Sequence, residues 1–103
     1  MANPMRIRAR ADGDIVQVRV LISHVMETGL RKDAQGELVP AHYIQLIDVT
    51  YDGRIVLSAE WGPAVSRNPY LAFKFRGGAP GGKVRVTWTD NLGETQSYEA
   101  SVE

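Results

Sequence analysis

Apolar and polar side chains alternate along most of the chain with a period of two residues. Near the start, Ile7, Ala9 and Ala11 alternate with arginines. Because successive side chains of a β-strand point to opposite faces, this alternation predicts strands with one buried face. The pattern recurs in seven segments that we expect to form strands: 7–11, 16–22, 43–51, 55–61, 71–75, 84–88 and 98–102.

Turn residues separate these segments at short intervals. Asp52-Gly53 joins two of them directly, which predicts a type I′ hairpin, because both central residues of that turn need positive φ. Residues 12–14 and 90–93 fit two further turns, and the glycine-rich stretch 77–82 predicts a flexible hairpin loop. No segment shows a helical period. We therefore predict one all-β domain over residues 1–103, an immunoglobulin-like antiparallel β-sandwich of about seven strands.

Composition excludes several kinds of function. Twelve Lys and Arg balance twelve Asp and Glu, so bulk charge gives no reason to expect a nucleic-acid partner. The chain has no cysteine, which excludes disulfides, cysteine-ligated metals and a cysteine nucleophile. No stretch has the length of apolar residues that a membrane span needs, and residues 1–14 lack the apolar centre of a signal peptide.

Two connections are longer than a turn requires, and they carry a family resemblance. The first contains SHVMETGLRKD at residues 23–33, followed by Gly36, Pro40 and Ala41. The second is WGPAVSRNPY at residues 61–70. In this order and at this spacing, over nearly the whole chain, the motifs resemble SoxZ, a subunit of the bacterial sulfur-oxidation (Sox) system.

The resemblance implies a non-catalytic sandwich subunit that pairs with SoxY in the SoxYZ sulfur-carrier complex of thiosulfate oxidation. In that family SoxY holds the sulfur intermediates on a cysteine, and other Sox enzymes visit the complex transiently. SoxZ members lack their own export signal and are thought to reach the periplasm with SoxY. The family has no established catalytic residue on this subunit and implies no cofactor.

The first long connection contains the residue types that could bind a ligand. His24 and His42 stand at its two ends, and His24 with Met26 offers atoms that bind borderline metals. Two histidines without a cysteine or a spaced carboxylate favour a hydrogen-bonded loop instead. Glu27 and Asn68 are further loop candidates. A stand-alone module that binds a small anion or metal through residues 24–33 is the alternative function.

Apolar residues stand on both faces of the segment 43–51. Ile44 and Leu46 fall on one face, and a second set falls on the other. A β-bulge that turns both sets inward is the alternative. Otherwise one apolar face needs a partner subunit, or a second copy of the isolated chain, to cover it. The interface candidates are the second set and three residues of the first long connection: Met26, Arg31, Lys32, Tyr43, Ile47, Val49 and Tyr51.

Four arginines form a basic strip. Arg6, Arg8 and Arg10 share a face of the first predicted strand, and Arg19 is expected on its neighbour. Charged residues on an outer strand discourage edge-to-edge aggregation. A strip of this kind is also suited to an acidic partner surface or an anionic ligand, so the two interpretations stay open.

Overall fold

The computed structural model describes residues 5–103, so the first four residues of the predicted domain lie outside the described range. The described residues form strands joined by turns and loops, and they contain no helix that could cross a membrane. The seven strands are β1 (Arg6–Asp12), β2 (Ile15–Leu21), β3 (Ile44–Tyr51), β4 (Arg54–Glu60), β5 (Tyr70–Arg76), β6 (Lys83–Asp90) and β7 (Thr95–Ser101).

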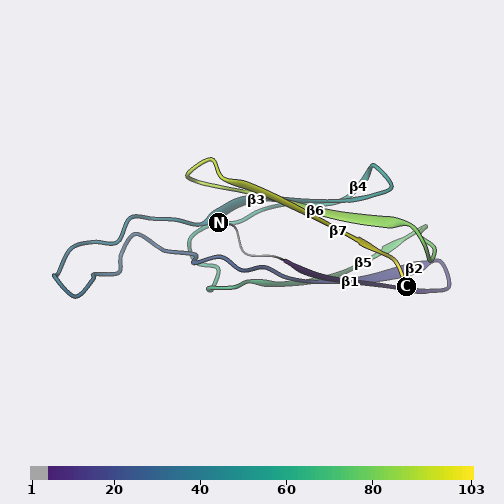
Figure 1. Ribbon diagram of the computed structural model, residues 1–103, viewed down its shortest axis with the longest axis horizontal. Coiled ribbons are helices and arrows are strands. Elements are labelled where there is room, and N and C mark those ends of the chain that lie inside the picture. The colour runs from purple at the N-terminus through teal and green to yellow at the C-terminus, as the bar shows by residue number, and fades with distance from the viewer. Residues whose placement is uncertain (1–4) are drawn as a thin grey trace.

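The strands form two antiparallel sheets that face each other (Figure 1). One sheet has the order β1-β2-β5 and the other the order β4-β3-β6-β7. Most apolar positions of the strands face the opposite sheet, as two packed sheets require. The predicted all-β, immunoglobulin-like antiparallel sandwich is confirmed, with strands in each of the seven expected segments.

The core consists mainly of branched aliphatic side chains from β2, β3 and β6. Val16, Val18, Val84 and Val86 are completely buried, and Trp88 is nearly so. Full burial of such a side chain stabilises the fold by about 1.5–3 kcal/mol. β-Branched residues also favour strand geometry. The same residues therefore determine both the local conformation and the packing.

The predicted turns are found in the structure, with one exception. Asp52 and Gly53 have φ of 46° and 86°, so the predicted hairpin between β3 and β4 is confirmed. Segment 77–82, however, connects β5 in one sheet to β6 in the other, so the predicted hairpin loop is wrong. This crossover packs closely. The Ala79 N–H donates to the Tyr51 hydroxyl at 3.0 Å, and a Cβ on Gly82 would overlap the Tyr51 ring.

β3 departs from regular alternation, and this changes which residues face outward. Its pairing shifts between Ile44 and Leu46 and again between Val49 and Thr50. As a result Ile44, Ile47 and Val49 are all completely buried, while Leu46 is 47% exposed. Ile47 and Val49 lie in the core of this chain, so placing them on a partner surface was wrong. The bulge alternative holds only in part, because the irregularity brings Ile44 into the core but leaves Leu46 outside.

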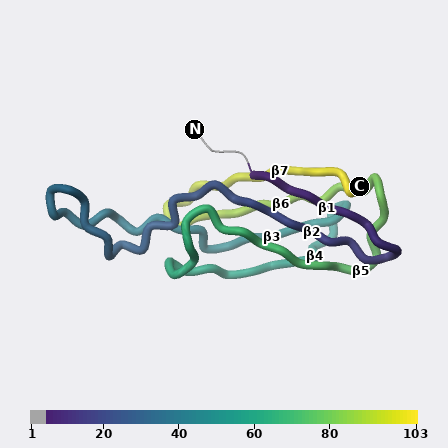
Figure 2. The backbone as a smooth tube through the Cα atoms, turned by 90° about the horizontal axis from the view of Figure 1, so that it is seen from below, coloured from purple at the N-terminus to yellow at the C-terminus, as the bar shows by residue number. Residues whose placement is uncertain are grey.

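The connection between β2 and β3, residues 22–43, projects from one end of the sandwich (Figures 1 and 2). We call it the arm. It makes the molecule 54 Å long but only 23 by 20 Å in cross-section. Its two sides pair with each other through bridges between Glu27 and His42 and between Lys32 and Leu38. Because the tip extends beyond the sheets, only the base of the arm contacts the core.

Neighbouring residues of β3 test this register. We expect Ile44→Ala to lower the free energy of unfolding by about 2–5 kcal/mol, since it leaves a cavity in the core, whereas a regular strand would place Ile44 on the outer face with Leu46. Leu46→Ala removes the same class of side chain from the outer face and should cost less than about 1 kcal/mol. Urea denaturation of both variants measures the difference. Equal losses would contradict the bulged register.

Candidate functional site

Both histidines meet one carboxylate at the base of the arm. His24 follows β2, His42 precedes β3, and Asp90 is the last residue of β6. The Oδ2 atom of Asp90 lies 3.2 Å from Nε2 of His24 and 2.7 Å from Nε2 of His42. The two imidazole rings stand edge to face with centroids 4.6 Å apart. The cluster therefore joins both ends of the arm to the turn between β6 and β7.

Asp90 is almost completely buried, yet its carboxylate is fully hydrogen-bonded. Its second oxygen, Oδ1, accepts from the N–H groups of Leu92 at 3.0 Å and Glu94 at 2.9 Å. With the two imidazoles, four N–H groups thus point at one carboxylate. The aspartate closes the β6–β7 turn with one oxygen and holds the arm with the other. A buried charge is tolerated when its hydrogen bonds are satisfied in this way.

Opposing effects act on the pKa of Asp90. Burial, the largest single effect, raises the pKa, because a low-dielectric surrounding disfavours the charged form. Hydrogen bonds from His24, His42 and the backbone of Glu94 and Leu92 act in the other direction. Together they outweigh burial, and the pKa of Asp90 lies below its ordinary value. The ionised carboxylate is therefore the form that stabilises the fold.

The hydrogen bonds define where the proton of His24 resides. The backbone N–H of Met26 donates to Nδ1 of His24 at 3.1 Å, so Nδ1 carries a lone pair. The ring proton must then be on Nε2, which donates to Asp90. Met26 reaches this position with a φ of 47°, and the Ile44 N–H donates to its sulfur at 3.4 Å. Met26 is consequently buried, 5% exposed, and faces the core.

The cluster has the atom types of a metal site. His24, His42 and Asp90 each offer one ligand atom, and these atoms lie within 4.8 Å of one another. Two imidazoles and a carboxylate are suitable ligands for zinc or ferrous iron. A ligating histidine, however, normally donates its other N–H to an acceptor. Nδ1 of His24 instead accepts from Met26, so the geometry favours a hydrogen-bonded clasp. We use this name for His24, His42 and Asp90.

The second long connection packs against the first at the clasp. The Asn68 N–H donates to the His24 carbonyl at 2.9 Å, and Asn68 Oδ1 accepts from the His24 N–H at 3.1 Å. Asn68 has a φ of 51°, so it is left-handed rather than extended before Pro69. The Ile22 N–H also donates to the Pro69 carbonyl. The two long connections are therefore neighbours in the fold.

An open groove of about 410 Å³ lies beside the clasp. Its apolar floor and wall come from Val25, Val39, Pro40, Ala41 and Leu92. At its rim, Nε of Arg31 donates to both carboxylate oxygens of Glu27, at 2.9 and 3.0 Å. This hydrogen bond is the main reason that the pKa of Glu27 lies below its ordinary value. Arg67 and His42 complete the lining.

The other predicted interface residues lie in different surroundings. Arg31 and Lys32 are exposed on the arm, whereas Tyr43 and Tyr51 are half-buried against the core. Sequence reasoning missed Asp90, although its position at the start of an Asp-Asn-Leu-Gly turn marks it as a turn-closing residue. It also missed Leu30 and Leu38, which are 82% and 59% exposed. The sequence alone could have identified them, because each is an isolated apolar residue in an otherwise polar connection.

Solved structures with the same fold place the chain in a structural class. A hypothetical protein, PH1083 from Pyrococcus horikoshii OT3, superposes with a TM-score of 0.66 at 20% identity, covering 98% of this chain and 88% of its own. A superoxide reductase from Nanoarchaeum equitans gives 0.65 at 13%, covering 96% and 91%. Another superoxide reductase, in its oxidised state, gives 0.65 at 19%, covering 96% and 86%. At these identities the likeness shows a shared sandwich fold alone.

The family follows from the sequence. A search of curated proteins found no significant match. The family model of the sulphur oxidation protein SoxZ, in contrast, matches residues 5–101, nearly the whole chain. The chain belongs to the SoxZ family, as the resemblance predicted, and is a subunit of the sulfur-oxidation (Sox) system.

The clasp predicts a specific pH dependence. Because the pKa of Asp90 is lowered in the folded state, its ionisation stabilises the fold above the ordinary aspartate pKa of about 3.9, and this contribution is lost as the pH falls through the folded-state value. Asp90→Asn should cost about 1.5–3 kcal/mol near neutral pH.

Urea denaturation from about pH 6 to pH 3 measures this effect. The deficit of Asp90→Asn relative to the unsubstituted chain should shrink as the pH falls. Asp14→Asn, in the exposed β1–β2 turn, is the control and should show no deficit. A deficit for Asp90→Asn that stays constant with pH would rule out an ionised carboxylate in the clasp.

Proposed function

We propose that this chain is the non-catalytic partner of a cysteine-bearing SoxY subunit, and that the arm and its base form the contact surface. The observation that carries the proposal is the distribution of exposed apolar side chains. Of the eight large ones on the described surface, six lie on the arm or at the end of the sandwich from which it projects. These six are Leu21, Val25, Leu30, Leu38, Tyr70 and Leu92.

The arm is well suited to a stable interface because its base is already ordered. The clasp holds both ends, Glu27 and His42 pair through two backbone hydrogen bonds of 2.6 and 3.0 Å, and Asn68 fixes His24. A surface that is rigid before association loses less conformational entropy on binding. The groove beside Leu92 then offers a concave apolar site next to the exposed leucines of the arm.

Several observations support a non-catalytic role. The chain contains no cysteine, so a covalently bound sulfur intermediate needs a thiol on another polypeptide. The titratable groups of the clasp are hydrogen-bonded to one another, and only His42 also borders the groove. We propose that the chain holds SoxY while other Sox enzymes act on the tethered sulfur. Export to the periplasm together with SoxY is part of this proposal.

The alternative function, a stand-alone module that binds a small anion or metal through residues 24–33, has less support. Arg31 is already neutralised by Glu27, and His24 uses both ring nitrogens within the chain. Arg67 is the other cation that lines the groove, whereas Lys32 lies farther out on the arm. Association of the isolated chain with its own copy through the arm remains compatible with the exposed leucines.

Substitutions of exposed leucine and isoleucine residues test the interface. We expect the double variant Leu30→Asp/Leu38→Asp to weaken SoxY binding about 100-fold, because it places two charges in an apolar contact. Ile55→Asp is the matched control. Ile55 is 64% exposed but lies at the opposite end of the sandwich, beside the β3–β4 turn, so its variant should bind normally. Co-purification and calorimetry with purified SoxY measure the affinities.

The result can contradict the proposal in two ways. If the arm variant binds SoxY as the unsubstituted chain does, the arm is not the contact surface. If Ile55→Asp alone abolishes binding, the contact lies on the outer face of the four-stranded sheet. Unfolding midpoints of both variants establish that neither substitution acts by unfolding the chain, since all three positions are exposed.

A further inference from the structure

The outer face of the three-stranded sheet collects half of the positive charge of a chain that is neutral overall. Strand register places the outward residues in rows, in which Arg8 lies opposite Arg19, and Arg10 opposite Gln17. Asp12 is the single acidic residue among the outward positions of the three strands. We call this surface the basic face, and its cations are Arg6, Arg8, Arg10, Arg19, Lys74 and Arg76.

Protection of a sheet edge explains only part of this charge. The free edge of β1 is already covered, because the Ala11 N–H donates to the Glu103 carbonyl and the Glu103 N–H donates to the Ala9 carbonyl, both at 2.9 Å. β2, which carries Arg19, is the central strand and has no edge. Outward side chains also stand perpendicular to the sheet rather than along its edge. Edge protection therefore leaves Arg19 unexplained, although it still applies to Lys74 and Arg76 on β5, the other edge strand of this sheet.

The cations of the basic face are not neutralised within the described chain. Between residues 5 and 103, none of the six makes a side-chain hydrogen bond or an ion pair within 4 Å. Arg8 and Arg19 are directly opposite each other, and like charges in that arrangement destabilise a sheet. Unpaired cations held against their own repulsion indicate a surface whose counter-charges come from another molecule.

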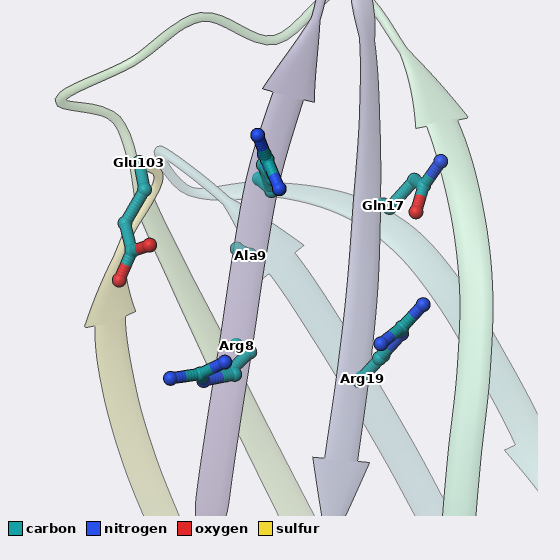
Figure 3. A pocket seen from close by; sticks show the side chains of 6 residues that line it. Arg8, Ala9, Gln17, Arg19 and Glu103 are labelled. Atoms are coloured by element: carbon teal, nitrogen blue, oxygen red, sulfur yellow. The ribbon is translucent and has the colours of Figure 1, made fainter.

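The arrangement of the arginines indicates the kind of partner. The guanidinium groups of Arg8 and Arg19 point away from each other instead of converging on one point (Figure 3). The hollow between them is small, about 140 Å³, and Glu103 borders it. A single oxyanion would need converging donors. Six cations spread over the outward rows of three strands match a broad surface with several carboxylates.

We propose that the basic face docks an acidic surface of a second protein partner. The apolar surface proposed for SoxY reaches the arm end of the same sheet, where Leu21 lies opposite Arg6. Arg8, Arg10 and Arg19 lie farther along the strands, so the second partner is expected to dock on these three arginines. Exposed charges of this kind accelerate association and add little lasting affinity. The contact should therefore be transient and sensitive to salt. This inference does not depend on whether the arm binds SoxY.

Two triple variants with the same change in net charge test the inference. The face variant is Arg8→Gln/Arg10→Gln/Arg19→Gln. The control variant is Arg54→Gln/Lys83→Gln/Arg85→Gln, which removes three exposed cations from the other sheet. The probe is a fluorescent polyglutamate peptide, and its anisotropy is measured with the chain alone and with the SoxY complex. Sulfate and phosphatidylglycerol vesicles are separate probes.

We expect polyglutamate to bind the unsubstituted chain, the face variant to bind it about tenfold more weakly, and the control variant within about twofold. Binding should weaken steadily as salt rises through about 0.1 M. Equal losses in both variants would mean that only net charge matters, and would overturn the inference. Absence of polyglutamate binding, or stoichiometric binding of sulfate or of vesicles in its place, would also overturn it. Measurement with the chain alone keeps this outcome separate from failure of the SoxY contact.

Discussion

The carboxylate of Asp90 connects the parts of this molecule that the sheets alone would leave apart. It is buried at the end of β6, and it can remain ionised there because four N–H groups satisfy it. Two of those groups come from histidines at opposite ends of the arm. The same charge therefore closes one turn and anchors a long projecting connection, and loss of the charge removes both restraints together.

The core, the arm and the outer face of the three-stranded sheet differ in physical character. The core is aliphatic and supplies a rigid support. The arm presents isolated leucines and an apolar groove, which suit a lasting contact with a partner subunit. One sheet face presents unpaired cations, which suit a contact that forms and dissociates quickly. The chain has no thiol, and the contribution that we propose for it is to hold and present the subunit that carries the sulfur. Binding surfaces on a rigid scaffold suit that proposed role.

The sequence predicted the strands and most turns, because alternation and turn residues act locally. It failed where the outcome depended on distant partners. An irregularity between Ile44 and Leu46 brings Ile44 onto the same buried face as Ile47 and Val49, and no local pattern distinguishes a bulge from a second apolar face. His24 and Asp90 are 66 residues apart, so only the folded chain brings them together. The crossover at 77–82 joins two sheets, which its glycines alone do not reveal.

Hydrogen exchange of this chain, measured alone and bound to SoxY, tests the role of the arm most directly. Amides that a partner covers exchange more slowly, and the position of the protection locates the contact. If the arm and its base form the interface, the added protection falls in residues 22–43 and in the β6–β7 turn at 91–94. If the added protection falls instead on β3 and β4, with the arm exchanging as it does in the isolated chain, the arm does not bind the partner.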